Sequence, residues 1–383
     1  MKSYTGSSCL ENAYNAGKEA ALKANAKDAK LAFVYASCDY DLKKLLKGVQ
    51  EVLECPIIGN TSFTGVIMPE GYIGGDKKFV GVMVLGGPNL EVGVGFAARA
   101  SYKSARDAGA AAAKKAMVDG KKPDAVYMTA SPTEEEFFMK GIFSEIGRVP
   151  TFGGSCADNS IAGQWSLYAD KNITQEGVAV AFIYTGAKFA NVFTGAYKET
   201  KDMGIITKID GNRKLVEIDG QPAVKVYAKW RKMKPKNLLG DKLLAETITS
   251  PLGIKDRLGD LVAIRHPMNG NPDLSMNIGN NLAVGTTVIR MEASVDELIE
   301  SVRENIAKLN AKLGTKPAFY HLVHCGGRRA GIAERIQEVY EGVIQEVQGV
   351  PFIMEFTFGE YGYEDDGRNT CGGLMLSFTA FTK

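Results

Sequence analysis

The order of apolar and polar residues along the chain indicates one structural unit that recurs three times. Helices are predicted where apolar residues return every three or four positions, and strands where a short run is apolar throughout. The first copy reads as helix, strand, helix, strand and strand, over residues 11–26, 31–37, 41–53, 56–58 and 79–85. Asp39 or Asp41 is the expected N-cap of the second helix.

The same order of elements returns twice further along the chain. The second copy covers residues 104–118, 125–129, 134–146, 150–152 and 177–184. The third copy covers residues 295–313, 318–324, 331–348, 351–358 and 374–381. In each copy a proline begins the fourth element, at Pro56, Pro150 and Pro351. The distance from the polar residue that ends the first strand to this proline is 18 residues from Cys38, 19 from Ser131 and 26 from Cys325. The similar spacing in the first two copies supports their alignment.

These elements predict an α/β fold built around sheets. Strands joined by helices of this length pair in parallel through right-handed crossovers. Apolar runs with little alternation are typical of strands that are covered on both faces. The last strand of each copy is expected to extend the same sheet in the opposite direction. The sequence therefore predicts mixed, mostly parallel sheets from three repeated α-β-α-β-β units.

Residues 191–291 interrupt the repeat. Turn sequences such as Asp210-Gly211-Asn212 and Asp219-Gly220 lie between short alternating runs, which is the pattern of β-hairpins. We interpret this segment as an antiparallel β-rich insert. It divides the chain into an N-terminal region of two units, residues 1–190, and a C-terminal region, residues 191–383, in which residues 292–383 hold the third unit.

Composition narrows the possible partners. The chain of 383 residues is 45% hydrophobic with a net charge of +2, so it has ample core and no field that would attract nucleic acid or an anionic membrane. No run approaches the roughly 20 apolar residues of a membrane span, and residues 1–9 do not resemble a signal peptide. The six cysteines include no CxxC pair. We therefore expect a cytoplasmic protein with reduced thiols that binds neither nucleic acid nor membranes.

Glycines and small polar residues gather at the ends of the predicted strands. In open α/β sheets ligands bind at the carboxyl ends of the strands, and a glycine there lets the backbone approach a ligand. The candidate ligand-binding residues at these ends are Asn60 and Thr61 in the first copy, Gly153, Gly154, Ser155 and Asp158 in the second, and Cys325, Arg328, Glu360 and Asn369 in the third.

Several of these stretches resemble the FIST family. Residues 324–328 (HCGGR) resemble the Cys-x-Gly-Arg signature of the FIST C-terminal domain, and residues 357–360 (TFGE) look like its Thr-aromatic-Gly-Glu element. Asn369 is similar to the asparagine of its Asn-Gln-Thr element. Residues 152–158 (FGGSCAD) and 218–223 (IDGQPA) are similar to the Gly-Gly-Ser-Ala-Ala-Asp and Leu-Asp-Gly-x-Pro-Ala elements. The resemblance covers nearly the whole chain.

The resemblance implies a sensory protein for a small ligand, with an amino acid or another carboxylate as the expected ligand. FIST regions often lie beside signalling output domains; here they account for nearly all of the sequence, so the implied signal transduction passes to a separate partner chain. Arg328 would hold a carboxylate through two parallel donors. Glu360 and Asn369 would accept the donor groups of the ligand, and residues 153–155 would offer backbone amides.

These assignments have structural alternatives. Arg328 could form an ion pair with Glu360, or with Glu364 or Asp365 at the surface. Asp158 could serve only as an N-cap or a turn-forming residue.

An enzyme that uses Cys325 or Cys156 as its nucleophile, a hydrolase or a transferase, is the alternative class. A catalytic cysteine needs a nearby base, and His321 and His324 are close in sequence. On a strand, residues 321 and 325 share one face while residue 324 points to the other. Cys325 is therefore expected to line a pocket wall, and we expect a binding protein and not an enzyme.

His266 offers a further alternative, as the axial ligand of a haem with Met268 nearby. The chain has no CxxCH attachment sequence, and neither GxxxxGK[ST] nor GxGxxG occurs in it. The sequence therefore predicts no cofactor and no metal site, with haem as the alternative.

Overall fold

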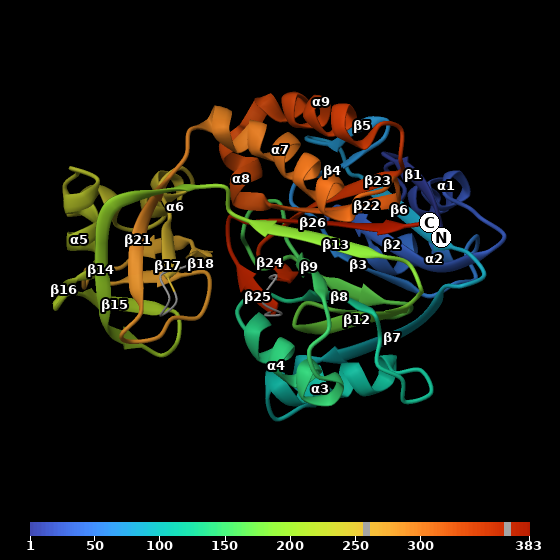
Figure 1. Ribbon diagram of the computed structural model, residues 1–383, viewed down its shortest axis with the longest axis horizontal. Coiled ribbons are helices and arrows are strands. Elements are labelled where there is room, and N and C mark those ends of the chain that lie inside the picture. Colours follow the sequence, from blue (N-terminus) through green and yellow to red (C-terminus); the bar gives the residue numbers. More distant parts are fainter. Residues whose placement is uncertain (256–260, 364–368) are drawn as a thin grey trace.

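The computed structural model of the chain describes residues 1–255, 261–363 and 369–383. The protein is mixed α/β, with three sheets in a core and a fourth sheet in a lobe beside it (Figure 1). The lobe comprises residues 198–292 and is inserted in the third part of the core. Within the described ranges, no helix is long and apolar enough to cross a membrane.

The first core sheet has the strand order β1-β6-β2-β3-β10-β11. Its strands are β1 (Lys2–Ser8), β6 (Val80–Gly86), β2 (Ala29–Ala36), β3 (Ile57–Thr61), β10 (Leu167–Ala169) and β11 (Asn172–Thr174). The helices α1 (Ala13–Lys23) and α2 (Leu42–Gln50) pack on it. The Asp41 side chain accepts a hydrogen bond of 3.2 Å from the backbone N–H of Lys44, so the N-cap predicted there is confirmed.

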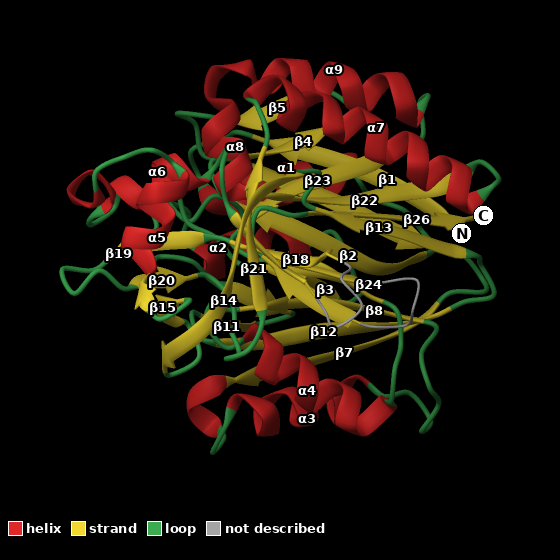
Figure 2. Ribbon diagram, turned by 60° about the vertical axis from the view of Figure 1, so that its left-hand side comes forward, coloured by secondary structure: helices red, strands yellow, loops and turns green. Residues whose placement is uncertain are grey.

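The second and third core sheets repeat this order of pairing. The second consists of β7 (Glu91–Ala98), β12 (Gly177–Tyr184), β8 (Ala125–Ala130), β9 (Thr151–Ser155), β24 (Glu360–Tyr363) and β25 (Asn369–Gly372), with α3 (Ala105–Ala116) and α4 (Glu135–Ile146). The third consists of β13 (Phe189–Thr194), β26 (Leu376–Thr382), β22 (Pro317–Cys325), β23 (Phe352–Thr357), β4 (Gly65–Met68) and β5 (Gly71–Gly74), with α7 (Val295–Leu313), α8 (Gly326–Ile332) and α9 (Ile336–Val347). Figure 2 shows α7 and α9 on one side of the core and α3 and α4 on the opposite side.

Each part of the chain lends a hairpin to another sheet. The strands β4 and β5 lie between β3 and β6 in the chain, yet β4 pairs with β23 of the third sheet. In the same way β10 pairs with β3 of the first sheet, and β24 pairs with β9 of the second. The three sheets are therefore interlocked in a closed cycle. The order predicted for each part, α-β-α-β-β, differs from the structure in two ways. It lacks the exchanged hairpin, and it lacks the strand before the first helix, which is β1, β7 or β13.

The expectation of mostly parallel sheets is wrong. Among the described residues, parallel pairing occurs only between β2 and β3, β8 and β9, and β22 and β23. A helical crossover joins the two strands of each of these pairs, as parallel pairing requires. The last strand of each part folds back between the first two strands and pairs antiparallel with both, and the hairpins add more antiparallel pairs.

Glycines bring the helices of the first two parts into backbone contact. A Cβ atom on Gly17 of α1 would lie 2.2 Å from the carbonyl oxygen of Leu45, and one on Gly48 of α2 would lie 2.1 Å from that of Tyr14. Gly109 and Gly141 repeat this arrangement between α3 and α4. Only glycine permits so close an approach, which explains why each of these four helices carries a glycine at the contact.

The three sheets meet at a cluster of rings. Phe33, Tyr127 and His321 occupy the second partnered position of the parallel pair in their respective sheets. Their ring centroids are 4.8 Å, 5.0 Å and 5.3 Å apart, and all three side chains are buried. The pseudo-equivalent strands therefore converge on one axis at the centre of the core.

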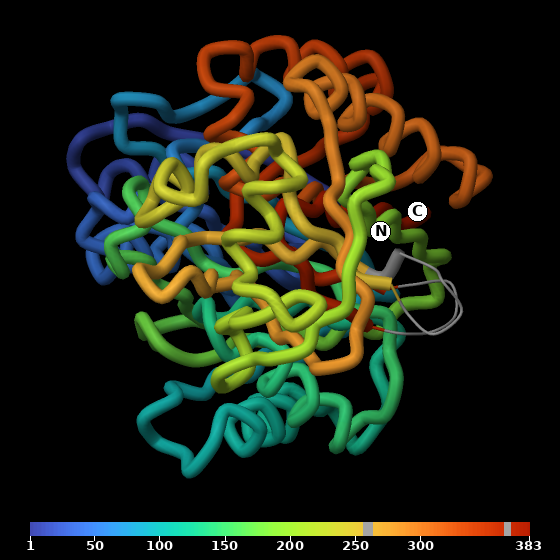
Figure 3. Tube along the Cα trace, turned by 90° about the vertical axis from the view of Figure 1, so that its left-hand side faces the viewer, coloured from blue at the N-terminus to red at the C-terminus, as the bar shows by residue number. Residues whose placement is uncertain are grey.

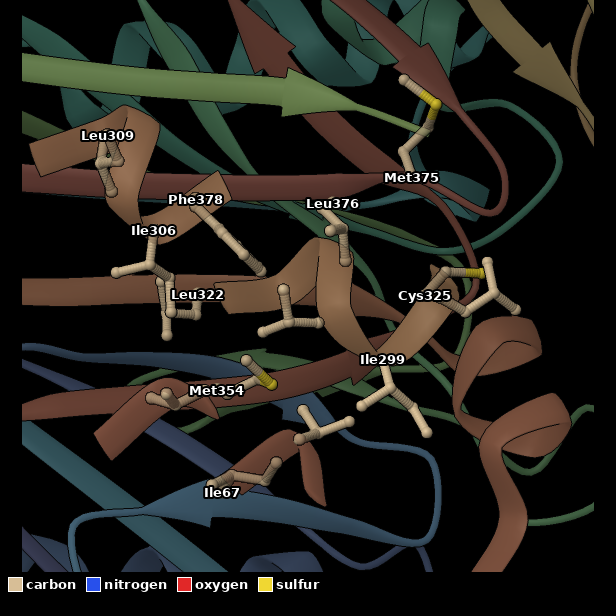
Figure 4. Packing of buried hydrophobic residues seen from close by; sticks show 14 of the residues in the cluster. Ile67, Ile299, Ile306, Leu309, Leu322, Cys325, Met354, Met375, Leu376 and Phe378 are labelled. Carbon is tan, nitrogen blue, oxygen red and sulfur yellow. The ribbon is translucent and has the colours of Figure 1, made fainter. Parts of the chain in front are cut away.

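The third sheet contributes the largest apolar layer, beneath α7. Ile306 and Leu309 of the helix pack toward Leu322 and Phe378 of the sheet, and Cys325 lies at the end of this layer (Figure 4). The helix α7 begins with a capping box formed by Ser294 and Glu297.

The lobe is an antiparallel sheet, as the predicted insert was, but it also contains helices. Its strand order is β18-β17-β21-β14-β15-β20-β19, and β16 pairs with β15. These strands are β14 (Lys198–Asp210), β15 (Lys214–Ile218), β16 (Gln221–Pro222), β17 (Leu252–Lys255), β18 (Leu261–Arg265), β19 (Pro267–Gly270), β20 (Met276–Ile278) and β21 (Thr287–Glu292), with helices α5 (Ala223–Trp230) and α6 (Lys242–Thr247). Figure 3 views the molecule from the side of this lobe. Residues 191–194, which were expected in the insert, belong to β13 of the third core sheet.

Candidate small-molecule site

A cavity of about 270 Å³ lies where the lobe meets the ends of core strands. The core contributes residues that follow β3, β8, β9, β22, β23 and β25, and the lobe contributes Arg213 and residues between 244 and 280. Its lining includes Phe63, Pro132, Ile161, Trp165, Leu244, Ile248, Met268, Ile278, Ala330 and Phe358, all of them apolar. A few polar groups converge on this apolar lining, which is the usual composition of a small-molecule site.

A larger hollow of about 740 Å³ is a weaker candidate. It is lined by residues 25–30, 52–56 and 90–92, near the carboxyl ends of α1 and α2. Its polar side chains, such as Lys27, Lys30 and Glu54, are exposed to solvent, so it lacks the enclosed character of the smaller cavity.

Aromatic rings form one wall of the cavity. Trp165 meets Phe358 edge to face, with ring centroids 6.0 Å apart, and Phe358 also contacts Phe63 at 5.9 Å. The indole N–H of Trp165 donates to the carbonyl oxygen of Gln175 at 3.1 Å, which fixes the ring. These three rings come from three distant parts of the chain and offer a ligand flat apolar surfaces.

Two buried polar side chains form a corner of the cavity. His266 and Asn280 are 4% and 1% exposed, and both line the cavity. The Nε2 atom of His266 and the Oδ1 atom of Asn280 have no hydrogen-bond partner. Burial lowers the pKa of His266 to about 4, so the imidazole is neutral. A buried polar atom without a partner is costly, and a bound ligand would remove that cost.

Glycines leave this corner open. A Cβ atom on Gly327 would lie 3.4 Å from Cε1 of His266 and 3.6 Å from Sγ of Cys325. One on Gly373 would lie 3.4 Å from Oδ1 of Asn280. Side chains at these two positions would occupy the space beside both unpartnered atoms.

An ion cluster forms the charged edge of the cavity. Arg213 donates from NH2 to carboxylate oxygens of Glu135 and Glu136, each at 2.6 Å. Its other nitrogens donate to the carbonyl oxygen of Gly279 at 2.5 Å and to the side chain of Asn281 at 3.2 Å. Burial raises the pKa of Glu135. Because two carboxyl groups already share this guanidinium, it has little left to offer an anion.

Cys325 lines the cavity, as the sequence predicted. Its sulfur accepts hydrogen bonds from the backbone N–H groups of Gly327 at 3.3 Å and Leu374 at 3.2 Å. Burial, and then the nearby Glu360, raise the pKa of the thiol. The strand register places Ser37 of the first sheet and Ser131 of the second at the positions equivalent to Cys325. The sequence alignment of the three copies had matched Cys325 with Cys38, which is one residue further along the chain.

Neither histidine near Cys325 in sequence hydrogen-bonds its thiol. His321 lies in the core, where its Nε2 atom is 2.5 Å from the hydroxyl of Tyr35. The ring of His324 hydrogen-bonds the carbonyl oxygen of Cys325 at 2.9 Å. Cys156 is fully buried, and burial raises its pKa well above the usual value.

Arg328 is fully buried and does not line the cavity. It donates to the carbonyl oxygens of Gly195 at 2.5 Å and Leu298 at 3.0 Å, and to Oγ of Ser301 at 2.6 Å. Its guanidinium also lies over the ring of Tyr197, 5.6 Å from the centroid. The structure thus gives this side chain protein partners where the sequence predicted a carboxylate ligand.

The structural alternative for Arg328 was an ion pair with Glu360, Glu364 or Asp365. Within the described part of the chain, no ion pair joins it to Glu360. Glu364 and Asp365 lie outside the described residues.

Glu360 and Asn369 also hold the backbone together away from the cavity. The Glu360 carboxylate accepts from the hydroxyl of Thr357 and the backbone N–H of Met375, both at 2.9 Å. Burial raises its pKa to about 8. Asn369 accepts from the N–H of Thr151 at 3.2 Å and donates to the carbonyl oxygen of Val149 at 2.8 Å.

The strand β24 covers the backbone of residues 153–155, which was expected to offer amides to a ligand. Gly153 and Gly154 pair with Tyr361 and Glu360, so this backbone is not free to meet a ligand. The hydroxyl of Ser155 donates to Glu135 at 3.1 Å and lies 2.7 Å from that of Tyr361.

Asn60 and Thr61 are buried in the core. Asn60 donates to Oε2 of Glu355 at 2.9 Å and accepts from the hydroxyls of Tyr127 and Thr129. Thr61 exchanges hydrogen bonds with the backbone of Ser166. Both residues join sheets to one another and lie outside the cavity lining.

Asp158 organises the loop that borders the cavity. Its carboxylate accepts from the backbone N–H groups of Ser160 at 3.0 Å, Gln164 at 2.7 Å, Ala162 at 3.0 Å, and Ile161. Ile161 is held at a φ of 57° and lines the cavity at the protein surface. Asp158 therefore positions Ile161 without lining the cavity itself.

Of the predicted site residues, only Cys325 lines the cavity. His266, which was considered as an alternative haem ligand, also lines the cavity, as does Met268. Among the described residues, no group of three or more His, Cys, Asp or Glu side chains is placed to hold a metal ion.

The sequence did not point to four residues of the cavity lining, which are Phe63, Trp165, Asn280 and Phe358. Asn280 lies in the segment that was interpreted only as hairpins, and no motif around it indicated a binding site.

A mixed α/β core with a concave, mainly apolar cavity is typical of proteins that bind small molecules. Residues 30–221 match the family model of the FIST N domain, and residues 223–363 match that of the FIST C domain. The chain therefore belongs to the FIST family, whose domains are generally sensory domains for small ligands. Comparison with curated proteins gives no match.

Two solved structures are similar over the whole chain at low scores. Cyanuric acid hydrolase from A. caulinodans is 6% identical, with 100% of this chain and 99% of that chain covered and a TM-score of 0.31. PurLQS from Thermotoga maritima is 7% identical, with 100% and 72% covered and a TM-score of 0.24. Both TM-scores are below 0.5, so neither likeness bears on fold or function.

Proposed function

We propose that this FIST protein is a sensor that binds its small ligand in the cavity between core and lobe, and that it signals to a separate partner chain. The observation that carries the proposal is an apolar cavity of about 270 Å³, open to the surface beside Ile161 and Ala330. Two buried polar atoms that line it, Nε2 of His266 and Oδ1 of Asn280, have no partners. Among the described residues, nine buried side-chain atoms have no partner, and of these only the atoms of His266 and Asn280 belong to residues that line the cavity, where a ligand can complete them.

The position of the cavity supports a sensory role. A ligand there would contact the core through Phe358 and Trp165, and the lobe through Ile248 and Met268. Binding would therefore favour one spacing of lobe and core over others, because a ligand shifts a conformational equilibrium by its differential affinity for the two states. The partner chain would then recognise the position that the lobe takes when the ligand is bound.

The ligand expected from the family resemblance, an amino acid or another carboxylate, loses its proposed anchor. The donors of Arg328 are taken by Gly195, Leu298 and Ser301. Arg213, the lining cation, is already paired with two carboxyl groups. A cysteine-dependent hydrolase or transferase also has less support, because burial raises the pKa of Cys325 and the two backbone N–H groups give its sulfur a structural role.

Trp165 provides the test, since the chain has two tryptophans and only this one lines the cavity. In a Trp230→Phe background, Trp165 is the sole tryptophan. The protein is first mildly unfolded and refolded to release bound molecules. When it is then titrated with an extract of small metabolites, we expect a saturable change in the fluorescence of Trp165. Native mass spectrometry of the untreated protein should find the same molecule.

Ala330→Phe serves as the blocking variant, because Ala330 is exposed and lines the cavity. It should abolish the fluorescence change while leaving thermal unfolding nearly unchanged. If no extract changes the fluorescence of Trp165, or if Ala330→Phe responds like its parent, the cavity is not the binding site.

A further inference from the structure

We infer that the cavity selects an uncharged aromatic or heteroaromatic molecule of about ten non-hydrogen atoms, whose N–H or O–H donors bind Nε2 of His266 and Oδ1 of Asn280. This inference rests on the proposed function, since it assumes that a ligand occupies this cavity.

The polar corner presents acceptors. The backbone of Leu244 acts on the pKa of His266, and Nε2 of the neutral imidazole has no partner. We place the ring proton on Nδ1, which leaves a lone pair on Nε2. Asn280 uses its amide nitrogen on Sγ of Cys371 at 3.3 Å, which leaves Oδ1 toward the cavity. The two side chains approach the same point, because a Cβ atom on Gly373 would lie 3.3 Å from Cβ of His266 and 3.4 Å from Oδ1 of Asn280. A ligand must therefore bring donors, and a planar amide or ring N–H suits this corner.

The charges around the cavity disfavour ions of both signs. An anion would meet Glu135, and the guanidinium of Arg213 already serves that carboxyl group and Glu136. A cation would be buried among apolar walls next to a neutral imidazole, where no unshared carboxylate lines the cavity within the described residues. The raised pKa of Glu135 and the lowered pKa of His266 both reflect this cost of burying charge.

The size and shape of the cavity favour a single aromatic ring with a short substituent. At about 30 Å³ per water molecule, 270 Å³ corresponds to roughly nine waters. The rings of Trp165 and Phe358 are nearly perpendicular, at 88°, so a bound ring can stack on one of them and meet the edge of the other.

Four probes of equal heavy-atom count separate these requirements. Benzamide is neutral and carries two N–H donors; acetophenone is neutral without donors; benzoate is an anion; benzamidinium is a cation with donors. Affinities are measured by Trp165 fluorescence in the Trp230→Phe background. We expect benzamide to bind at least about tenfold more tightly than the other three, because a site that hydrogen-bonds a donor rejects analogues without it.

Two variants assign the preference to the corner. In Asn280→Leu and His266→Phe, the affinity for benzamide should fall to that of acetophenone, whose own affinity should change little. The matched control is Asn305→Leu, because Asn305 is also 1% exposed with an unpartnered Oδ1 but does not line the cavity. It should keep the preference for benzamide.

The contrary outcomes are distinct. Tightest binding of benzoate or benzamidinium would overturn the claim that the ligand is uncharged, and equal binding of benzamide and acetophenone would overturn the claim that donors are read. If none of the four binds while an extract still changes Trp165 fluorescence in a manner that Ala330→Phe blocks, the ligand class is wrong and the proposed function stands. If nothing binds at all, the proposed function fails.

Discussion

The guanidinium of Arg328 donates a hydrogen bond of 2.5 Å to the carbonyl oxygen of Gly195. Arg328 lies in α8, at the end of the central strand of the third sheet, and Gly195 follows β13 where the chain leaves the core for the lobe. A further bond to Leu298 reaches α7. One buried side chain thus ties together three segments at the junction of core and lobe.

The first prediction is that Arg328 acts on stability. Arg328→Ala should lower the free energy of unfolding by at least about 3 kcal/mol, because hydrogen bonds to charged groups contribute about 1.5–3 kcal/mol each and their acceptors are buried. Arg328→Lys should recover only part, since an ammonium group cannot reproduce the planar fork of donors. Chemical denaturation measures both.

Arg329→Lys is the matched control, because the neighbouring Arg329 donates to Ala333 and Tyr72 at the partly exposed face. Its effect should be below about 1 kcal/mol. A stable Arg328→Ala protein that had lost ligand binding would show instead that Arg328 serves the ligand.

The second prediction concerns the pH dependence of stability. Burial raises the pKa of Glu355 from its usual value of 4.5 to about 8. Between these pH values the unfolded chain loses the proton while the folded chain keeps it, so this group makes the free energy of unfolding fall as pH rises, by up to about 1.4 kcal/mol per pH unit. Glu355→Gln removes this component.

The stability of Glu355→Gln relative to the parent should therefore increase as the pH is raised from about 5 to about 8. Asn60 can still donate to the glutamine oxygen, which limits other effects of the substitution. Urea titrations across this range measure the difference. A difference that stays constant with pH would mean that Glu355 ionises normally in the folded protein.

The third prediction tests the close helix pairs. Gly17→Ala should cost about 1–3 kcal/mol, because the new methyl group would meet the carbonyl oxygen of Leu45 and the helices must separate. Gly342→Ala, in the exposed part of α9, meets only the side chain of Arg303 at 3.3 Å and should be neutral or stabilising by up to about 1 kcal/mol. Thermal unfolding compares the two variants. Equal effects would show that helix propensity alone decides.

The fourth prediction concerns the thiols. All six cysteines are free, and Cys9 is exposed while Cys156, Cys325 and Cys371 are buried. Alkylation of the native protein should modify Cys9 first and these three only after unfolding. Mass mapping under non-reducing conditions should find six free thiols. Rapid labelling of Cys325 in the native protein would favour the enzymatic alternative, and a bridge between Cys325 and Cys371 would favour a redox role.

The local elements could be predicted from the sequence because their signals are local. The N-cap Asp41 and the periodic helix at residues 295–313 illustrate this, since capping and apolar period are properties of adjacent residues. The exchange of hairpins carries no such signal. Nothing near Val66 or Ile67 indicates that their partners are Glu355 and Met354, almost three hundred residues away.

The candidate site was harder to predict for the same reason. Strand ends were identified as sites, and Cys325 does line the cavity. The sequence could not show that β24 would cover Gly153 and Gly154, or that Arg328 would find backbone acceptors in Gly195. The cavity itself depends on how the lobe closes over the core, which places His266 and Asn280 beside residues that are distant in sequence.

The exchange of hairpins sets the order in which the protein can be completed during synthesis. The first sheet needs β10 and β11, which end at Ala169 and Thr174, although its other four strands are finished by Gly86. The second sheet waits for β25 at Gly372, and the third for β26 at Thr382. A ribosome must therefore emit almost the entire chain before two of the three sheets can close. Until then β9 lacks its partner β24, and the hairpin of β4 and β5 lacks its partner β23. These strands are open to mispairing, so early binding by a chaperone would matter more for this protein than for one built from self-contained repeats.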